Sequence, residues 1–582
     1  MDIFSILTLF GGLALFLFGM NYMGAGLEKL SGGKLERMLE KLTDNPVKGV
    51  LLGAVVTAII QSSSATTVMV VGFVNSGIMK LTQAIGIIMG ANIGTTATAW
   101  ILSLSSLDGD AWYIKLLKPD SFSPIAALIG VVMIMASKND KKKDIGSILV
   151  GFAILMYGMS SMSDAVAPLA DMPEFGKILL IFNNPVLGVL AGAVLTAIIQ
   201  SSSASVGILQ ALSATGLLPY STAMPIIMGQ NIGTCVTAIL SSIGATRNAK
   251  RAACVHLYFN LIGTVIFLIG YYTLDAIIGF PFADDMITSR GIATIHTTFN
   301  LITTALLLPF YKFLGKLATL TVKDAPAKDA PAPLLDERFL ATPSFALEQC
   351  SNTAQGMAEL SHGIVLRSLN LIDSYDEKEA AFIIEKEDEV DNYEDQLGTY
   401  LVKLSSRDLS LEDSKTASRL LHNIGDFERI SDHAVNIQEA AKEMRDKNIT
   451  FSPEAQRELA VVREAMREIL QLTLESFQTN NLQLAARIEP LEQVIDDLID
   501  QVRENHIRRL QGGRCTIELG FVLADLLTNF ERVSDHCSNL AACMIKSDEQ
   551  SYETHKYLNE VKAPGNAAFA GEFSAYAAKY TL

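Results

Sequence analysis

The chain reads NPVKGVLLGAVVTAIIQSSSATT over residues 45–67, and NPVLGVLAGAVLTAIIQSSSASV repeats this stretch over residues 184–206. A second pair of segments follows at matching distances: IIMGANIGTTATA over residues 87–99 and IIMGQNIGTCVTA over residues 226–238. The matches are densest at a polar QSSS cluster and at an NIGT segment, both embedded in apolar sequence where polar residues are costly. The sequence therefore contains a duplicated unit whose polar positions are candidates for a binding site.

Charge divides the 582 residues into two parts. The formal net charge is +3 up to Leu320 and −19 beyond it, for a total of −16. Residues 178–246 contain no Asp, Glu, Lys or Arg, a length far beyond the roughly 20 apolar residues that one spanning helix needs. We therefore expect four parts in chain order: a membrane domain (1–320), a Pro/Ala-rich linker (321–343), a soluble domain (344–547) and a tail (548–582).

The positions of the Lys and Arg residues predict which connecting segments face the cytoplasm. Lys and Arg cluster at residues 29–48, 80, 138–143, 247–251 and from 312 onward, and placing all of them in the cytoplasm satisfies the positive-inside tendency. The N-terminus lacks a basic region and a cleavage site, so we interpret it as the first span and not as a signal peptide. Seven crossings follow, with the soluble domain cytoplasmic, near residues 3–22, 81–105, 120–137, 145–163, 222–243, 252–274 and 291–311. Six cysteines without a CxxC pair indicate neither disulfides nor zinc and fit a bacterial-type inner membrane protein.

Two pairs of apolar segments are too short to span a membrane: residues 49–60 with 65–77, and residues 188–199 with 204–216. We expect each pair to form a re-entrant hairpin with QSSS at its tip. Three crossings separate the copies, so the second repeat (about 149–244) should be inverted relative to the first (about 10–105). Such repeats are typical of secondary transporters, whose binding site lies where the broken helices converge. The alternative is one long spanning helix with a Ser-rich kink in place of each hairpin.

Polar groups at the tips suit an anion and cations together. The second arm of each hairpin starts with N–H groups that lack partners and carry the positive end of the helix dipole. Serine hydroxyls can donate to an anion or coordinate a cation. We also expect both NIGT segments to be unwound turns whose carbonyl, amide and hydroxyl oxygens are hard ligands suited to Na⁺. The candidate site residues are Gln61, Ser62, Ser63, Ser64, Asn92, Thr95, Thr96, Gln200, Ser201, Ser202, Ser203, Asn231 and Thr234.

The hairpins and the broken spans contain no charged residue. A buried multivalent anion without Arg or Lys carries a desolvation cost of several kcal/mol, which co-bound cations would cancel. The absence of Asp and Glu argues against a carboxylate proton relay. His256 and His296 share an HxxFN pattern and could carry a proton, although neutral helix-packing histidines are the preferred interpretation.

These motifs resemble the type II sodium-dependent phosphate cotransporter family, whose mark is a pair of QSSS motifs in inverted repeats. The resemblance covers the membrane half. It implies that residues 61–64 and 200–203 contact phosphate and Na⁺, with Thr95, Thr96 and Thr234 nearby. The second repeat has Cys235 where the first has Thr96, and Val206 where the first has Thr67. A cation site carried over by symmetry therefore lacks two hydroxyls.

The soluble half predicts long helices, and it also repeats. FERISDHAVN at residues 427–436 recurs as FERVSDHCSN at residues 530–539. The sequence contains four pairs of acidic residues, and the two acids of each pair are four residues apart. This spacing places both carboxylates of a pair on one helix face, where they repel unless a cation lies between them. We expect oxygen ligation of a metal, although a solvated face explains any single pair. The eight candidates are Glu387, Asp391, Glu428, Asp432, Glu492, Asp496, Glu531 and Asp535.

This half resembles the PhoU family of phosphate-signalling regulators. The resemblance implies a helical bundle of two three-helix units with multinuclear metal clusters, so the expected fold is all-α. No nucleotide loop or catalytic triad is present, and we expect neither an enzyme nor a nucleic-acid partner. The leading hypothesis is a Na⁺-coupled symporter of inorganic phosphate in the lipid bilayer, with a PhoU-like regulatory domain. A carrier of another oxyanion and a phosphate sensor without turnover are alternatives, and a homo-oligomer stays open.

Overall fold

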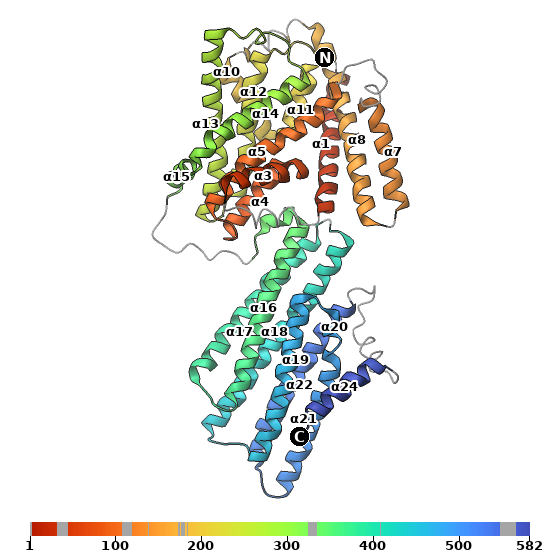
Figure 1. Ribbon diagram of the computed structural model, residues 1–582, viewed down its shortest axis with the longest axis vertical. Helices are drawn as coiled ribbons and strands as arrows, with labels where there is room; N and C mark the ends of the chain where they lie inside the picture. The colour runs from red at the N-terminus through yellow and green to blue at the C-terminus, as the bar shows by residue number, and fades with distance from the viewer. Residues whose placement is uncertain are drawn as a thin grey trace. The chain divides into compact units, whose positions relative to one another are not determined.

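A computed structural model of the chain divides into two compact units, Met1–Phe345 and Ala346–Leu582, which we name the membrane unit and the helical unit (Figure 1). The described residues are 3–31, 45–106, 119–137, 139–172, 175, 181–182, 184–323, 335–407, 409–546 and 566–582. Residues 324–334 of the expected linker, and residues 547–565, which include the first part of the expected tail, lie outside them. Both units are built from helices.

The membrane unit holds the duplicated segments. Its α-helices are α1 (Ile3–Ser31), α3 (Pro46–Ile60), α4 (Ser63–Asn75), α5 (Leu81–Ser103), α7 (Pro119–Ala136), α8 (Asp140–Val166), α10 (Pro185–Ile199), α11 (Ser202–Ser213), α12 (Tyr220–Ser241), α13 (Arg247–Ile278), α14 (Ser289–Leu307) and α15 (Tyr311–Thr321). Short 3₁₀ turns are η1 (Leu104–Ser106), η2 (Ala167–Asp171), η3 (Leu308–Phe310) and η4 (Glu337–Ala341).

Six stretches of the described chain are long and apolar enough to cross a membrane. They contain α1, α5, α8, α12, α13 and α14, and so coincide with six of the seven expected crossings. The seventh expected crossing, residues 120–137, corresponds to the shorter apolar helix α7. The chain is therefore a multi-pass membrane protein.

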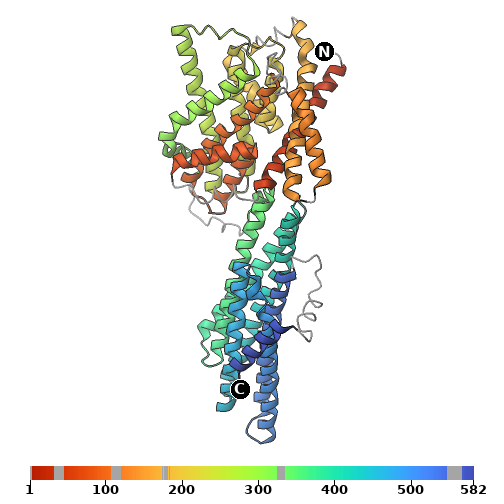
Figure 2. The same cartoon turned by 45° about the vertical axis from the view of Figure 1, so that its right-hand side comes forward.

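Two helical hairpins occupy equivalent places in the repeats. The first hairpin consists of α3 and α4, and the second consists of α10 and α11. The repeated Asn-Pro dipeptide starts each first arm: Asn45 accepts a hydrogen bond of 2.9 Å from the amide of Val47, and Asn184 accepts one of 3.0 Å from the amide of Val186. An Asn cap followed by Pro is a strong start signal for a helix. The hairpins lie toward opposite ends of the unit in both views (Figures 1 and 2).

Packing of the remaining helices encloses the hairpins. α8 lies against both α1 and α7 (Figure 1). Phe16 of α1 is fully buried with Met156 and Met159 of α8 and Ala204 of α11. This apolar cluster fixes α1 beside the second hairpin, so α1 can contribute a wall to any cavity at the tips.

The helical unit consists of long helices that run side by side (Figure 2). α16 is followed by α17 and α18 and, after them, by α19, α21 and α22, and α18 packs on α22. This arrangement gives the two expected three-helix units. The helices are α16 (Pro343–Leu371), α17 (Glu377–Ser405), α18 (Leu411–Asp446), α19 (Pro453–Thr479), α20 (Leu482–Ala485), α21 (Ile488–Gln511), α22 (Ile517–Lys546) and α24 (Ala567–Lys579).

Candidate functional site

Both hairpins break at the glutamine of the QSSS motif. Gln61 has φ 61° and ψ 22°, and Gln200 has φ 57° and ψ 23°. A left-handed backbone is uncommon for a residue other than glycine, and it ends the first arm at each tip. The expectation of two arms with QSSS between them is therefore correct, and the alternative of one kinked spanning helix is wrong.

The second arm of each hairpin starts within the serine run. Ser62 accepts a hydrogen bond of 3.1 Å from the amide of Ala65, and Ser201 accepts one of 3.2 Å from the amide of Ala204. Each of these serines is thus an N-cap that satisfies one of the free amides of its helix. The amides of the first two residues of each helix stay directed beyond the helix end, where the dipole favours negative charge. The local structure at each tip suits an anion.

A cavity of about 270 Å³ lies where the two tips meet. Segments from opposite repeats form it, together with one face of α1. All eight expected QSSS residues line it. The lining residues are Ile60, Gln61, Ser62, Ser63, Ser64 and Ala65 of the first tip, Gln200, Ser201, Ser202 and Ser203 of the second tip, and Met20, Asn21, Gly24, Ala25 and Glu28 of α1.

Sequence reasoning missed the contribution of α1. Its lining positions are spaced three to four residues apart and so lie on one helix face. Glu28 is the single Asp, Glu, Lys or Arg residue in the described lining of the cavity. The available signal was an Asn and a Glu, seven residues apart, near the end of an otherwise apolar helix. That signal does not say which partner the polar face meets, and only the packing of α1 on the second hairpin does.

The NIGT segments are not turns, and this expectation was wrong. α5 runs unbroken from Leu81 to Ser103, and α12 runs unbroken from Tyr220 to Ser241. Their glycines serve close packing of helices instead. A Cβ on Gly90 would lie 2.0 Å from the carbonyl oxygen of Val50 on α3, and one on Gly229 would lie 2.0 Å from that of Val189 on α10. Small residues at such contacts let two membrane helices approach closely.

The five other candidates stay outside the lining of the cavity. They are buried on α5 and α12, and their donor groups bond to their own helices at carbonyl oxygens three or four residues earlier. Such back-bonding satisfies a hydroxyl or amide without a ligand. The structure therefore does not bring these residues to the tips: Asn92, Thr95, Thr96, Asn231 and Thr234.

Asn231 instead joins a second polar cluster, where α12 meets α13 and α14. Its Nδ2 donates to the carbonyl of Ile227 at 3.0 Å, so its Oδ1 must accept from Nε2 of His296 at 3.2 Å. His296 is 1 % exposed and therefore neutral, since an isolated buried charge is costly. With the proton on Nε2, Nδ1 keeps a lone pair that has no partner among the described residues. The preferred interpretation of a neutral packing histidine agrees with this geometry.

The same cluster contains further acceptors without donors. Nδ2 of Asn260 donates to the carbonyl of His256 at 3.1 Å, and Nδ2 of Asn300 donates to the carbonyl of His296 at 2.8 Å. These bonds fix the amide orientations, because a carbonyl can only accept. Both Oδ1 atoms are buried and meet no donor among the described residues. The region where α12, α13 and α14 meet thus presents several bare acceptors, a chemistry that suits a cation or ordered water.

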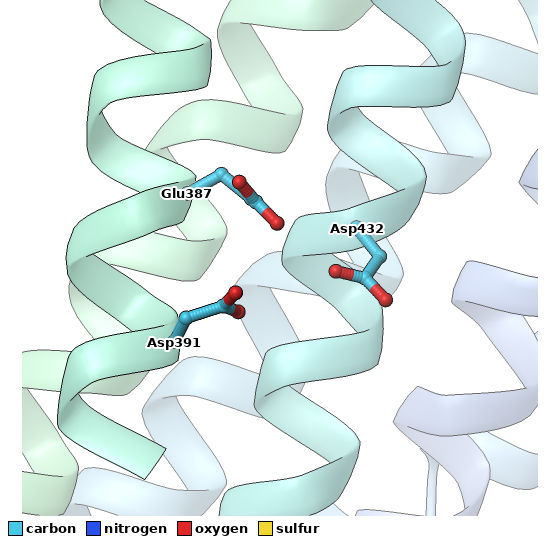
Figure 3. Close-up of side chains that lie close together, drawn as sticks. All are labelled: Glu387, Asp391 and Asp432. Carbon is cyan, nitrogen blue, oxygen red and sulfur yellow. The ribbon is translucent and has the colours of Figure 1, made fainter. Parts of the chain in front are cut away.

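One group of carboxylates comes together in the helical unit. Glu387 and Asp391 extend from α17 toward Asp432 of α18 (Figure 3), and ligand oxygens of all three lie within 4.8 Å of one another. Burial, together with the neighbouring Asp391 and Asp432, raises the pKa of Glu387 to about 7. Burial and Asp432 also raise the pKa of Glu428. Three oxygens that repel one another in this way are a fitting donor set for a hard cation.

The second repeat of this unit does not form an equivalent group. Among the described residues, no three of its acids meet in the same manner. Glu531 pairs with Arg503 at 2.6 Å, and Asp535 lies 3.6 Å from Arg532. Glu492 is buried. The expected set of eight ligands is therefore divided, and the part that meets the geometry of a metal site is the α17–α18 face.

Two family models match the chain. The model described as Na⁺/Pi-cotransporter matches residues 15–164 and 155–306, and the model described as PhoU domain matches residues 355–441 and 462–544. Together the two matches of the first model span half of the chain. They cover both QSSS tips, and the PhoU matches cover the acidic α17–α18 face.

Curated relatives agree with these matches. YjbB of Salmonella typhimurium is 24 % identical to the chain over 565 residues. The match covers 95 % of the chain and 100 % of YjbB, whose name assigns it provisionally to inorganic phosphate export. The chain is 33 % identical to YqeW of Bacillus subtilis, covering 56 % of the chain and 98 % of that relative. Sodium-dependent phosphate transport protein 2A of Rattus norvegicus is 25 % identical, covering 44 % of the chain and 59 % of that protein.

Two solved structures are similar to about a third of the chain. A crystal structure of PhoU from Pseudomonas aeruginosa covers 35 % of the chain and 98 % of its own length, with 21 % identity and a TM-score of 0.33. PhoU from Streptococcus pneumoniae gives the same TM-score of 0.33 at 16 % identity, covering 36 % of the chain and 98 % of its own length.

Proposed function

Because the chain belongs to the Na⁺/Pi-cotransporter family and carries PhoU domains in its second unit, we propose that it couples the movement of inorganic phosphate to Na⁺. This is a family of transporters and not of enzymes. The observation that carries the proposal is the single cavity lined by both QSSS tips. A volume of about 270 Å³ holds several groups of the size of a water molecule, which is room for a small oxyanion with co-bound ions.

Phosphate would bind at the tips through neutral donors. The first amides of α4 and α11 and the serine hydroxyls supply them from both repeats. Neutral dipoles offset only part of the cost of burying a multivalent anion. Cations must therefore enter with the anion to balance the charge. This requirement supports Na⁺ coupling.

A second observation favours a cation cargo. Oδ1 of Asn260, Oδ1 of Asn300 and Nδ1 of His296 are buried acceptors without a donor among the described residues. An unsatisfied buried acceptor costs about 1–3 kcal/mol, and several on adjoining helices need an explanation. Oxygen ligands of this kind suit a hard monovalent cation. We therefore extend the proposed ion site from the QSSS tips to the region between α12, α13 and α14.

Direction follows from the gradients. A coupled carrier is reversible, so the summed gradients of Na⁺ and phosphate decide the net flux. An inward Na⁺ gradient favours uptake, whereas the YjbB relatives are named for export. We propose from the charge pattern that the chain lies in the cytoplasmic membrane with the PhoU domains in the cytoplasm, where they would regulate the flux and hold a metal at Glu387, Asp391 and Asp432.

Counterflow in proteoliposomes tests the proposal. Purified full-length protein should exchange labelled phosphate across the membrane, and the exchange should require Na⁺ when Na⁺, K⁺ and pH are varied separately. Sulfate and arsenate as competitors measure the selectivity among oxyanions. A protein that binds phosphate but never exchanges it would be a sensor, and exchange driven equally well by a proton gradient without Na⁺ would refute the coupling.

Glu28→Gln sharpens this test. The substitution keeps the size of the side chain and removes the one carboxylate in the described lining of the cavity. We expect a shallower dependence of flux on Na⁺ concentration. Asp164→Asn is a matched control, because Asp164 stands on α8 outside the lining of the tip cavity. Equal Na⁺ dependence in the wild type and Glu28→Gln would remove Glu28 from the proposal.

A further inference from the structure

Residues 335–345, which we name the clip, belong to the membrane unit, and the helical unit begins directly after them at Ala346. They comprise η4 and the first residues of α16. Their apolar side chains are buried: Phe339 is 1 % exposed and Phe345 is 0 % exposed. Among the charged residues of the clip, Asp336 is 3 % exposed. A segment that buries two phenylalanines together with an aspartate forms a specific contact with the rest of the membrane unit.

Polar contacts of the clip join the two repeats. Oδ2 of Asp336 accepts from Nδ2 of Asn75 at 2.7 Å, and Oδ1 of Asn75 accepts from the amide of Thr246 at 2.7 Å. Arg338 pairs with Asp336 at 2.7 Å and donates from Nε to the carbonyl of Ser241 at 2.7 Å. Asn75 ends α4 of the first repeat, whereas Ser241 and Thr246 stand between α12 and α13 of the second. One connected network therefore holds both repeats.

Aromatic packing holds the clip on α4. The ring centroids of Phe73, Phe339 and Phe345 lie 5.0–5.4 Å from one another, so the three rings are in contact. A Cβ on Gly72 would meet the ring of Phe339 at 2.8 Å, so the absence of a side chain there permits the contact. Aromatic packing thus holds the clip on α4 in addition to its ion pair and hydrogen bonds.

α4 connects this contact to the binding cavity. It begins at Ser63, in the lining of the cavity, and ends at Asn75, in the clip network. A helix of 13 residues is a rigid rod about 18 Å long, so a restraint at one end acts at the other. Transport by repeated units requires one repeat to move against the other. We propose that the clip locks the first hairpin to the second repeat and so regulates access to the phosphate site.

The clip also offers a route for control by the PhoU domains. α16 begins at Pro343 within the clip and continues to Leu371 in the helical unit. A rearrangement of α16 therefore acts on the clip through continuous helix. This regulation rests on the proposed transport function, but the lock itself can be tested without it.

Hydrogen exchange and thiol labelling test the lock in the full-length protein. Asp336→Asn removes the charge that holds both Asn75 and Arg338. We expect exchange of the Thr246 amide to rise about tenfold and a cysteine introduced at Ala65, in the cavity lining, to be labelled about tenfold faster, as followed by mass spectrometry of its peptide. Asp140→Asn is the control, because it breaks an ion pair with Lys143 that is exposed in the same unit. Faster amide exchange with unchanged labelling would reduce the clip to a structural contact and overturn the proposal.

Flux separates this inference from the proposed function. If the wild type exchanges phosphate, Asp336→Asn should change its turnover at least threefold, and unchanged turnover would refute regulation. If the wild type exchanges none, the proposed function fails while labelling at position 65 still decides whether the lock exists.

Four glycines inserted between Phe345 and Ala346 test the route through α16. The insertion keeps the clip residues but interrupts the helix. Asp432→Asn, which alters the acidic face of the helical unit, should change labelling at position 65 in the continuous chain and leave it unchanged in the chain with the insertion. The same change in both chains, or none in either, would contradict control through the clip.

Discussion

The hydroxyl of Thr98 donates a hydrogen bond of 2.9 Å to Oε1 of Gln61. Nε2 of Gln61 donates to the carbonyl of Ala58, so both ends of this amide are held. The corresponding residues of the second repeat behave differently: Gln200 is exposed, and the hydroxyl of Thr237 meets no partner among the described residues. The glutamine of the first QSSS motif is thus fixed by hydrogen bonds at both ends of its amide, whereas the glutamine of the second motif is exposed.

A second pair of positions shows the same asymmetry. Thr57 donates to Thr66 at 3.0 Å, between the two arms of the first hairpin. The equivalent hydroxyls of Thr196 and Ser205 are both buried without a partner among the described residues. The two arms of the first hairpin are therefore joined by a side-chain hydrogen bond that the described residues of the second hairpin lack.

Thr98→Val tests the role of the held glutamine. The substitution keeps the shape of the side chain and removes one hydrogen bond, worth about 0.5–1.5 kcal/mol. We expect the apparent affinity for phosphate to fall about threefold to tenfold. Thr237→Val is the matched control and should leave the affinity unchanged, because its hydroxyl has no partner to lose. Equal effects of the two substitutions would show that the Gln61 bond is unimportant for binding.

Ser64→Ala and Ser203→Ala test the anion site. Each removes a hydroxyl from the first turn of α4 or α11, and a hydrogen bond to a charged group is worth about 1.5–3 kcal/mol. Phosphate affinity, measured from the concentration dependence of counterflow, should fall at least about tenfold for either substitution. Thr319→Ala, which removes a hydroxyl bonded within α15, serves as a control. Normal flux in the double variant would refute the site assignment.

Asn300→Leu tests the cation site between α12, α13 and α14. If a cation binds there, Na⁺ should raise the thermal unfolding temperature of the wild type, and the substitution should abolish that increase. If no cation binds, removing an unsatisfied acceptor should be neutral or stabilising in both Na⁺ and K⁺. Asn423→Leu is the control, because Asn423 is buried to the same extent and its side-chain amide has no partner among the described residues, but it stands in the helical unit. His296→Gln should keep the Na⁺ response if no proton is carried.

The pH dependence of metal binding tests the acidic face of α17 and α18. A raised pKa of about 7 for Glu387 means that the folded chain binds more protons than the unfolded chain between about pH 4.5 and 7. Stability without metal should therefore decrease as pH rises through that window, and the affinity for Mn²⁺ should increase, because metal and protons compete. Calorimetry at pH 6 and pH 8 measures both effects. Asp432→Asn should abolish metal binding and weaken, without removing, the pH dependence of stability, because burial and Asp391 still raise the pKa of Glu387. Metal affinity independent of pH would contradict the assignment.

Cysteine labelling tests the inversion of the repeats. Cysteines at Lys48 and Lys80 flank the first hairpin and should react from the cytoplasmic side. Cysteines at Asn184 and Tyr220 flank the second hairpin and should react from the outside. Membrane-impermeant reagents applied to cells and to inverted vesicles distinguish the two sides. Labelling of all four positions from one side would eliminate an inverted architecture.

Local signals were sufficient for much of the fold. The Asn-Pro starts, the apolar lengths and the QSSS interruptions predicted two broken hairpins, because caps and helix ends depend on neighbouring residues. The spacing of acids predicted which faces of the helical unit are charged. The glycines of the NIGT segments misled, since a glycine that permits a turn and one that permits close helix packing look the same in sequence. The carbonyl oxygen of Val50 lies so near Gly90 that a Cβ there would be 2.0 Å from it, which shows that this glycine permits close helix packing.

The sequence by itself determined that this protein is a duplicated membrane unit followed by a repeated helical one, and the chemistry of its serine-rich breaks made them the candidate anion-binding elements. Only the tertiary structure decided that α1 brings Glu28 to the tips, that Asn92 and Asn231 stand apart from them, and that Asp336 returns to bind Asn75. The physical reason is the separation in sequence of the residues that interact. Helix breaks and caps are local interactions, whereas a shared cavity or a clip joins residues far apart in sequence through packing that no local pattern encodes.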